Sequence, residues 1–306
     1  MICKFSSCPG SWGIEDSQNP ENTPWGIVLD EISNIGFTAL ELGPYGYLPF
    51  EAAFLTEELN KRNLQIVAGT LYDDLISKES FNRIVKKTHE ICRILSSVPT
   101  APALGIQTGS PPYYVVIDAV KPEREKLPRS VKAAMLSSDL WQQMVSHIKE
   151  IAKISYDGYG VRSVIHHHAG GYIDYMDEID MILSDISEDH VGLCFDTGHA
   201  YYAGIDPEQG IRRCGSRIEY VHFKDIDKSV YDVVINENIG FYEACFKRLM
   251  CPIGEGVLDY SSIRRALVEI DYHGWITLEQ DRHPSDTDNV PDCIKKSLTH
   301  LKELGY

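Results

Sequence analysis

The stretch VGLCFDTGHAYYAG, residues 191–204, decides the fold of this chain. Its apolar run, Val191 to Phe195, is typical of a parallel strand that is buried on both faces. The run ends abruptly at Asp196, which Thr197, Gly198 and His199 follow. In parallel α/β proteins the carboxyl ends of the strands carry the chemistry. The stretch therefore predicts a buried strand with part of a functional site at its end.

Three more apolar runs end in the same way. Residues 163–165 lead into three consecutive histidines, His166 to His168, residues 218–221 lead into His222, and residues 275–278 lead into Glu279. The repetition indicates that polar side chains from several strands gather at one edge of a sheet.

The remaining pattern alternates strands with helices along the whole chain. We predict strands at 3–6, 38–42, 64–68, 113–117, 162–165, 191–195, 218–221 and 275–278. Helices are expected at 25–35, 51–61, 80–95, 138–154, 174–186, 206–214, 240–250, 260–270 and 290–304. Strict alternation without a second compositional regime predicts an α/β fold, a single (β/α)8 TIM barrel that spans residues 1–306. A doubly wound open sheet is the weaker alternative, because Gly10 and Gly13 do not make a dinucleotide-binding fingerprint.

The composition limits the kinds of molecule that the protein is expected to bind. A formal net charge of −16 with no basic stripe argues against nucleic-acid binding. No apolar run is long enough for a membrane span and the N-terminus does not resemble a signal peptide, so the default expectation is a cytoplasmic protein without a membrane partner. The eight cysteines form no CxxC pair and are expected to be reduced thiols.

A divalent cation suits the polar residues at the strand ends. Asp196, His222 and Glu279 follow three different strands, and His168 is the candidate for a fourth ligand. Carboxylate and imidazole together bind ions such as Mn²⁺, Co²⁺, Mg²⁺ or Zn²⁺. Each residue alone also has a structural explanation; Asp196, for example, is well placed to cap a helix that starts at Thr197. Four such residues at four strand ends favour the metal site.

Further candidates lie at the same predicted rim. Glu41 is either a base or substrate ligand or a paired structural carboxylate, and Lys224 shares the face of His222 and is either a proton donor or a solvated lysine. Strand periodicity puts His166 and His168 on one side and His167 on the other. We select four residues as candidates for substrate binding: His199, Arg282, Trp12 and Tyr45.

Six segments carry a resemblance to a known family: ELGPYGYLP (41–49), HHHAGGYID (166–174), FDTGHAYYAG (195–204), VHFKD (221–225), CPIGEGVLDY (251–260) and GWITLEQD (274–281). Together they resemble the xylose-isomerase-like TIM-barrel superfamily, and within it the sequence is most similar to the inosose dehydratases. The resemblance covers nearly the whole chain. It implies one Mn²⁺ or Co²⁺ ion held by the residues that match Asp196, His222 and Glu279.

One departure from the superfamily bears on the reaction. Its sugar epimerases and isomerases resemble each other in a glutamate at the end of the fifth strand, whereas this sequence has His168 at the matching place, as the inosose dehydratases do. Without that second glutamate, the sequence lacks one of the two bases that a symmetric exchange of protons requires. A lyase instead needs one base and one acid.

We therefore predict a metal-dependent dehydratase that acts on a keto-cyclitol or keto-sugar such as an inosose through a metal-stabilised enediolate. Glu279 or Glu41 is the expected base. The expected acid is either a histidine of the triple, His166 or His168, or else Lys224. Two alternatives use the same site: a keto-sugar isomerase or epimerase, and a lyase that cleaves 3-oxo-glycosides. An endonuclease IV-like nuclease conflicts with the acidic charge, and a non-catalytic sugar-binding barrel would require a degenerate metal site. Barrels of this kind often form homo-oligomers, which is an analogy only.

Overall fold

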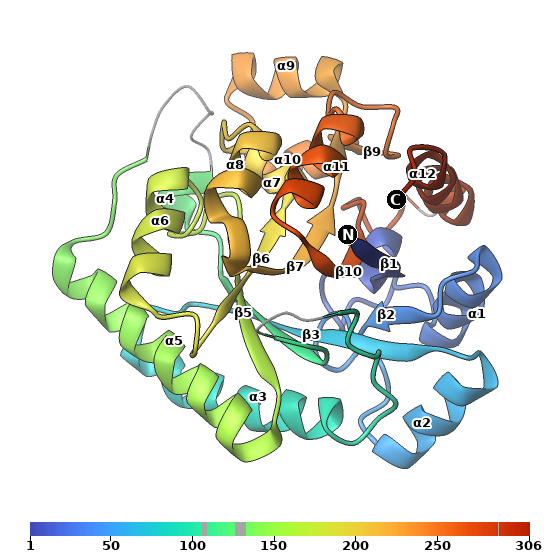
Figure 1. Ribbon diagram of the computed structural model, residues 1–306, viewed down its shortest axis with the longest axis horizontal. Helices are drawn as coiled ribbons and strands as arrows, with labels where there is room; N and C mark the ends of the chain where they lie inside the picture. Colours follow the sequence, from blue (N-terminus) through green and yellow to red (C-terminus); the bar gives the residue numbers. More distant parts are fainter. Residues whose placement is uncertain (106–108, 126–132, 287) are drawn as a thin grey trace.

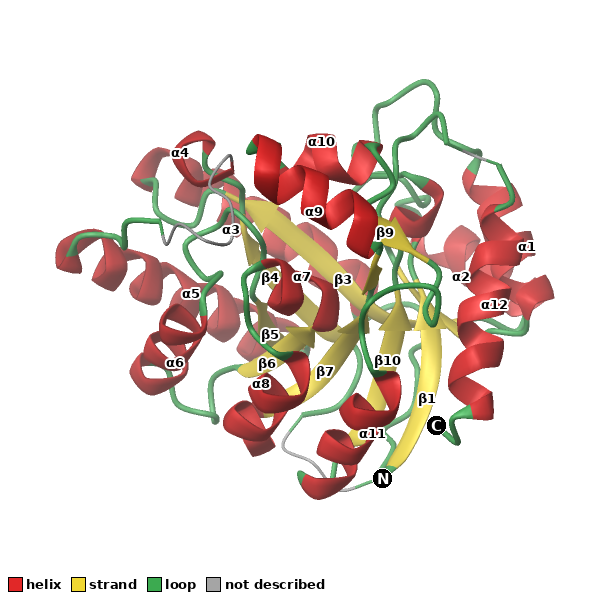
Figure 2. Cartoon of the chain, turned by 90° about the horizontal axis from the view of Figure 1, so that it is seen from above, coloured by secondary structure: helices red, strands yellow, loops and turns green. Residues whose placement is uncertain are grey.

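The computed structural model describes residues 1–105, 109–125, 133–286 and 288–306. Eight parallel strands close into a barrel in the order β1-β10-β7-β6-β5-β4-β3-β2. They are β1 (Ile2–Ser7), β2 (Ala39–Glu41), β3 (Gln65–Asp73), β4 (Tyr113–Asp118), β5 (Arg162–His166), β6 (Gly192–Asp196), β7 (Ile218–Phe223) and β10 (His273–Leu278). The predicted (β/α)8 barrel is confirmed, and Figures 1 and 2 show the helices packed around it.

The longer helices cover the outside of the barrel because each buries one apolar face, as α3 does with Ile84, Ile91 and Leu95. The helices are α1 (Trp25–Ile35), α2 (Ala52–Lys61), α3 (Lys78–Leu95), α4 (Pro122–Glu125), α5 (Ser138–Tyr159), α6 (Met176–Asp185), α7 (Thr197–Tyr202), α8 (Pro207–Cys214), α11 (Tyr260–Glu269) and α12 (Val290–Glu303), with two 3₁₀ turns, η1 (Pro9–Trp12) and η2 (Gly215–Arg217). Asp206 and Asp259 illustrate the local cause of their boundaries, since each accepts backbone N–H groups at the start of the helix that follows.

Strands β4, β5, β6 and β7 are buried along their whole length, as the continuous apolar runs predicted. Their register sets which residues meet at the carboxyl end of the barrel. Asp196 pairs with His222 across β6 and β7, and His166 pairs with Cys194 across β5 and β6. The polar ends of separate strands are thereby brought to one level.

The segment between β7 and α11 differs from the expectation of a single helix at 240–250. It contains β8 (Asp225–Ile226), α9 (Lys228–Glu237), α10 (Phe241–Phe246) and β9 (Met250–Cys251), and β8 and β9 pair antiparallel. Its apolar side chains pack around Tyr231, Phe241 and Leu249 in a small core that also includes Ala169 and Tyr202. In Figure 2, α9 and α10 lie next to each other beside the barrel strands. We call residues 225–251 the excursion.

Three further differences are short. The residues between 122 and 130, expected as a charged connection, include the helix α4, and positions 126–130 lie outside the described residues, as do 106–108 of the expected loop at 96–112. Strand β3 runs beyond the predicted end at 68 as far as Asp73.

The cysteines are all free thiols, as predicted. Among the described residues, no helix combines the length and apolar character that a membrane crossing requires.

Candidate metal and substrate site

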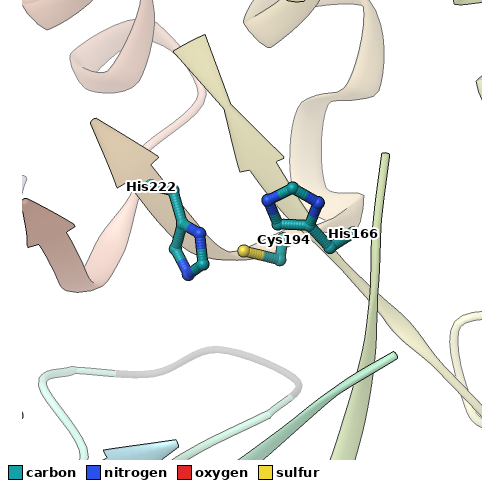
Figure 3. A group of neighbouring side chains, drawn as sticks. All are labelled: His166, Cys194 and His222. Carbon is teal, nitrogen blue, oxygen red and sulfur yellow. The ribbon is translucent and has the colours of Figure 1, made fainter. Parts of the chain in front are cut away.

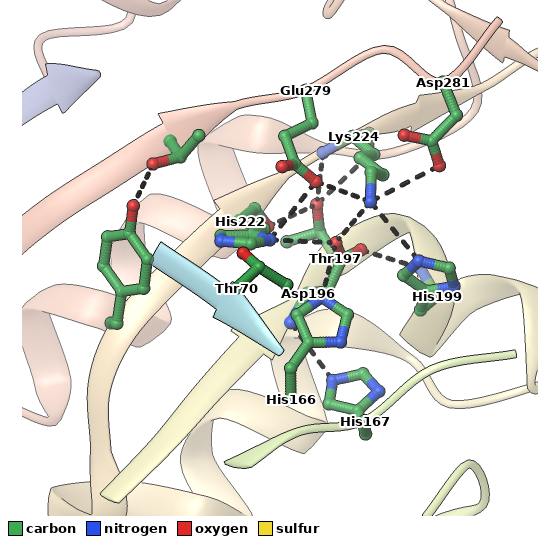
Figure 4. A network of polar contacts seen from close by, with 12 residues as sticks. Thr70, His166, His167, Asp196, Thr197, His199, His222, Lys224, Glu279 and Asp281 are labelled. Atoms are coloured by element: carbon green, nitrogen blue, oxygen red, sulfur yellow. Dashed lines mark hydrogen bonds and ion pairs between the residues drawn. The ribbon is translucent and has the colours of Figure 1, made fainter. Parts of the chain in front are cut away.

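The predicted polar residues do converge at the carboxyl end of the barrel (Figure 4). Glu41, His166 and Asp196 are the last residues of β2, β5 and β6, His222 lies near the end of β7, and Glu279 directly follows β10. The first four are almost completely buried. Because buried charged groups are costly unless they are paired, their interactions decide what the site can bind.

Asp196 uses its two carboxylate oxygens differently. Oδ1 accepts a hydrogen bond of 2.8 Å from the backbone N–H of His199 and so caps α7, as the capping explanation predicted. Oδ2 has no hydrogen-bond partner among the described residues, although Lys224 Nζ lies 3.1 Å away. Burial opposes the charge of Asp196, but Lys224 and other neighbours hold the pKa of its carboxyl well below the ordinary value. An ionised oxygen is therefore available to a cation.

His222 is oriented by Glu41. Its Nε2 lies 2.8 Å from Glu41 Oε1, which also accepts a hydrogen bond of 2.6 Å from the hydroxyl of Tyr220. The other ring nitrogen, Nδ1, is buried and has no hydrogen-bond partner among the described residues. It lies 3.2 Å from Glu279 Oε2 and 3.8 Å from Asp196 Oδ2. The ring is thus held with one nitrogen facing two carboxylates.

Lys224 supplies the positive charge within this cluster. Its Nζ lies 2.7 Å from Glu279 Oε2, 3.1 Å from Asp196 Oδ2 and 3.4 Å from Asp281 Oδ2. Burial opposes the charge, but the carboxylates, Asp196 foremost, raise the pKa of Lys224 well above its ordinary value. Its Cβ packs so closely on Gly198 that a side chain there would clash at 2.6 Å. Lys224 is therefore a buried ammonium that carries its proton in this cluster, which excludes the interpretation as a solvated lysine.

The described residues contain three groups whose ligand atoms lie within 4.8 Å of one another: His166, Cys194 and His222; His166, Asp196 and His199; and Glu41, His222 and Glu279. Figure 3 shows the first group, with Cys194 between the two histidines. The predicted ligands are divided between the second and third groups, which adjoin where His222 approaches Asp196. Asp196 Oδ2 and His222 Nδ1 are among the buried atoms of the described residues that have no hydrogen-bond partner. This donor set of carboxylate oxygen and imidazole nitrogen fits a divalent cation.

His168, the expected fourth ligand, belongs to none of these groups. Strand β5 ends at His166, so His168 lies in the following loop, where its Nδ1 lies 2.9 Å from the carbonyl oxygen of Ala169 and its ring packs on His199. His166 instead lies closest to the predicted ligands, with Nε2 3.4 Å from Asp196 Oδ2. Burial lowers the pKa of His168 to about 3, so it is a neutral ring.

The predicted alternation of the three histidines agrees with the structure. The rings of His166 and His168 lie 5.9 Å apart on the site side. His167 lies on the other side, against Phe195, and its Nε2 accepts the backbone N–H of Asp196 at 3.1 Å. His167 therefore supports the strand end that carries Asp196.

A cavity of 400 Å³ opens directly onto the cluster, and its lining includes Tyr45, Arg282, Glu41, His166, His168, His222, Lys224 and Glu279. Two of the four predicted substrate-binding residues, Tyr45 and Arg282, are thus at the cavity. Such a volume accommodates a sugar-sized molecule.

The other two predicted substrate-binding residues do not line this cavity. Trp12 is 2% exposed within the core, and its indole Nε1 donates a hydrogen bond of 2.6 Å to Glu31 on α1. The turn η1 directs Trp12 towards α1, so this side chain is not placed to contact a molecule in the cavity, contrary to its selection as a substrate-binding candidate. His199 is fully buried behind the cluster, and its Nε2 lies 3.3 Å from Lys224 Nζ. It contacts the cluster and not the cavity.

Sequence reasoning missed three residues at the site. Asp281 contacts Lys224, and alternation from Glu279 would have placed it on the same face. Cys194 lies between two histidines, and the same alternation from Asp196 indicates it. Tyr242 arrives from α10, and its hydroxyl lies 2.6 Å from that of Tyr72 at the end of β3, which links the excursion to the barrel above the cavity. No local pattern indicates that contact.

The fold and the site define a (β/α)8 barrel with a buried cluster of metal-ligand type at the carboxyl ends of its strands. A family model described as "Xylose isomerase-like TIM barrel" matches residues 29–304, and the chain belongs to this family. The chain is 26% identical over 261 residues to the inosose dehydratase of Geobacillus kaustophilus, covering 84% of this chain and 80% of that protein.

Solved structures share the fold. The structure of the IolI protein with a binding zinc atom aligns with a TM-score of 0.73 at 15% identity and covers 98% of this chain and 97% of that one. The D-allulose 3-epimerase from Methylomonas sp., in complex with D-allulose, aligns with a TM-score of 0.68 at 15% identity over 99% of this chain and 97% of that one. At these identities the likeness concerns the fold alone.

Proposed function

We propose that this protein is a divalent-metal-dependent lyase that removes water from a keto-cyclitol or keto-sugar such as an inosose. The observation that carries the proposal is the asymmetric cluster, in which ionised carboxylates, the neutral ring of His166 and the charged Lys224 lie beside a sugar-sized cavity. The similarity to inosose dehydratase supports the same reaction.

Asp196, His222 and Glu279 would hold the metal, with His166 as the nearest further nitrogen ligand. Mn²⁺ is our first expectation, and Co²⁺, Mg²⁺ and Zn²⁺ suit the same donors. The zinc atom bound in the IolI structure supports a metal in a protein of this fold. When bound, the ion would act as a Lewis acid on the ketone oxygen of the substrate.

Glu41 is the better of the two candidate bases. Its Oε1 is occupied by Tyr220 and His222, whereas Oε2 has only a long contact of 3.4 Å with the hydroxyl of Thr70. Glu41 lines the cavity, so Oε2 is available to remove the proton next to the ketone. Glu279, in contrast, is engaged with Lys224 and His222.

Lys224 is the better candidate for the acid. Burial lowers the pKa of His166, and Asp196 offsets this only in part, so the imidazole is neutral. It therefore lacks the second ring proton that it would donate as an acid. Lys224 keeps its proton and lines the cavity, where it can protonate the departing hydroxyl as water. A carboxylate that removes the proton next to the ketone and an ammonium that protonates the departing hydroxyl are the two groups that a dehydration requires.

The leading alternative is a keto-sugar isomerase or epimerase, which the shared fold with D-allulose 3-epimerase supports. That reaction returns a proton to carbon and does not need an acid for a leaving hydroxyl. His168, which stands where the resemblance implies a glutamate in the epimerases, favours the lyase. Cleavage of a 3-oxo-glycoside is the third possibility, because it also begins with removal of the proton next to the ketone.

Product mass tests the proposal. The purified protein is incubated with a panel of inososes, 3-keto-sugars and 3-oxo-glycosides, with and without added Mn²⁺ or Zn²⁺. We expect metal-dependent loss of one water from a ring ketone. An unchanged mass with altered stereochemistry would establish the epimerase, and release of an alcohol or sugar would establish the glycoside lyase. Turnover that survives complete removal of metal would refute the proposed site.

A further inference from the structure

Lys224 is held through its backbone as well as through its side chain. It lies between the end of β7 and the start of β8, where the chain leaves the barrel. Its backbone N–H donates a hydrogen bond of 3.0 Å to the hydroxyl oxygen of Thr197. Its carbonyl oxygen accepts a hydrogen bond of 2.9 Å from the hydroxyl of Tyr260. Side chains from two other segments thus bind both backbone polar groups of Lys224.

The hydroxyls of Thr197 and Tyr260, which we call the hydroxyl pair, contact each other. Thr197 Oγ1 lies 3.1 Å from the hydroxyl of Tyr260 and 3.1 Å from the carbonyl oxygen of Lys224. Both residues are buried. The ring of Tyr260 packs edge-on against Phe223, and its carbonyl oxygen accepts a hydrogen bond of 2.7 Å from the hydroxyl of Tyr306. The pair therefore belongs to a connected, buried hydrogen-bond network, which favours one fixed arrangement.

Gly198 allows the side chain of Lys224 to lie across the start of α7. A Cβ atom at Gly198 would lie 2.6 Å from the Cβ of Lys224 and 3.4 Å from its Cδ. From this position Nζ lies 3.4 Å from Asp281 Oδ2 and 3.3 Å from His199 Nε2 (Figure 4). Thr197 and Gly198 therefore act on the same lysine, one on its backbone and the other on the path of its side chain.

The carboxylates around Nζ do not provide all of its support. Asp196 and Glu279 lie 3.1 and 2.7 Å from Nζ, but both are also expected metal ligands, so a cation would share their oxygens. A general acid must lie within hydrogen-bond reach of the group that it protonates. A misplacement of about 1 Å can lower a rate by roughly 100-fold. The backbone contacts of Lys224 are independent of those two carboxylates and therefore suit this task.

We infer that Thr197 and Tyr260 are positioning residues, whose hydroxyls fix the backbone of Lys224 so that its ammonium reaches the departing hydroxyl of the substrate. This inference rests on the proposed function in that Lys224 is the acid of the dehydration. Loss of either hydroxyl is expected to move Nζ and to lower kcat, whereas substrate binding and metal binding stay unchanged because neither hydroxyl contacts the cavity or a predicted metal ligand side chain.

The test compares the loss of buried hydroxyls at the two ends of the barrel. With an inosose and Mn²⁺, we expect Tyr260→Phe and Thr197→Val to lower kcat by roughly 10- to 100-fold at unchanged KM and metal content. Thr197→Ser keeps the hydroxyl and should restore kcat. The matched control is Tyr272→Phe, which removes a buried hydroxyl that donates a hydrogen bond of 2.6 Å to the carbonyl oxygen of Trp275. It should shift the urea midpoint as Tyr260→Phe does but keep the wild-type kcat.

Two further measurements connect the effect to Lys224. In the Lys224→Met background, Tyr260→Phe should cause no further fall in the residual kcat, because a positioning residue acts only through the group that it positions. Crystal structures of wild type and Tyr260→Phe should show that Nζ has lost its contact with Asp281 in the variant, a distance of 3.4 Å in the present structure.

An unmoved Nζ in Tyr260→Phe would overturn the inference, whichever reaction the protein catalyses. An unchanged kcat in both Tyr260→Phe and Thr197→Val would overturn it too, as would a further loss of kcat in the Lys224→Met background. If Thr197→Val does not fold, Tyr260→Phe, which keeps its ring, supplies the same measurements. Full turnover by Lys224→Met, or no loss of water from any substrate, would refute the proposed function, and the crystal structures would then decide whether the hydroxyl pair holds Lys224.

Discussion

The two ends of the barrel differ in how completely their buried charged groups are paired. At the amino end, Arg162 and Glu219 form a fork-shaped pair, and Arg162 also donates hydrogen bonds to the carbonyl oxygens of Glu188 and Asp189. At the carboxyl end, Asp196 Oδ2, His222 Nδ1 and two nitrogens of Arg282 have no hydrogen-bond partner among the described residues. The contrast indicates that the amino end is built for stability, whereas the carboxyl end retains interactions for ligands.

Loss of Asp196 is expected to have the largest effect. Asp196→Asn keeps an oxygen to cap α7 but removes the charge that faces the cluster. We expect metal binding to be lost and turnover to fall by at least about 1,000-fold, since Lewis-acid stabilisation contributes several kcal/mol. Metal content by mass spectrometry and turnover measure this. Asp206→Asn, at the cap of α8, is the control and keeps both; retained metal and full turnover in Asp196→Asn would contradict the site.

Breaking the pair at the amino end should affect stability alone. Arg162→Met leaves Glu219 buried without its main partner and is expected to lower the free energy of unfolding by about 3 to 5 kcal/mol. Urea titration measures the loss, and the folded variant should bind metal as wild type does. Arg213→Met breaks an exposed pair of the same shape and should cost less than about 1 kcal/mol. Equal costs in the two variants would refute the contrast.

The buried carboxyl of Asp174, in the loop after β5, can be tested through the pH dependence of the free energy of unfolding. Burial raises the pKa of Asp174 to about 7, although the N–H of Gly170 and Arg124 partly lower it. The folded state therefore keeps a proton that the unfolded state releases near pH 4, and stability falls as the pH rises from about 4 to about 7. Asp174→Asn should flatten this part of the profile by at most about 4 kcal/mol, measured as unfolding free energy against pH. The exposed control Asp157→Asn should leave it unchanged, and an unaltered slope in Asp174→Asn would contradict the assignment.

The smallest effect is expected for Trp12. Trp12→Phe removes the hydrogen bond to Glu31 and should lower the free energy of unfolding by about 1 kcal/mol. Because Trp12 does not line the cavity, KM should stay within about twofold of the wild-type value. Tyr45→Ala, at the cavity lining, is the comparison and should raise KM. A large rise in KM for Trp12→Phe would restore it as a substrate-binding residue.

The sequence predicted the barrel and most of the site because both depend on local patterns. Apolar runs that end in polar residues marked β5, β6, β7 and β10, and each placed its last residues at the same end. Alternation also gave the correct sides for the three consecutive histidines.

Local patterns could not give distances between strands. His166 lies nearer the predicted ligands than His168 because β5 stops at His166, and that end is set by pairing with β6. The contact of His222 with Glu41 joins residues 181 positions apart, and the burial of Trp12 depends on α1. The first helix of the excursion, α9, was not predicted, since a single helix at 240–250 was expected in this connection.

The excursion also bears on how relatives of this protein can diverge. One continuous segment, residues 225–251, carries Tyr242 and Phe241 to the cavity and supplies most of a small core. The barrel strands that present Asp196 and Glu279 lie outside it. Exchange of this segment would therefore change which molecules enter the cavity. The strands that carry Asp196 and Glu279, and with them the reaction, would stay the same.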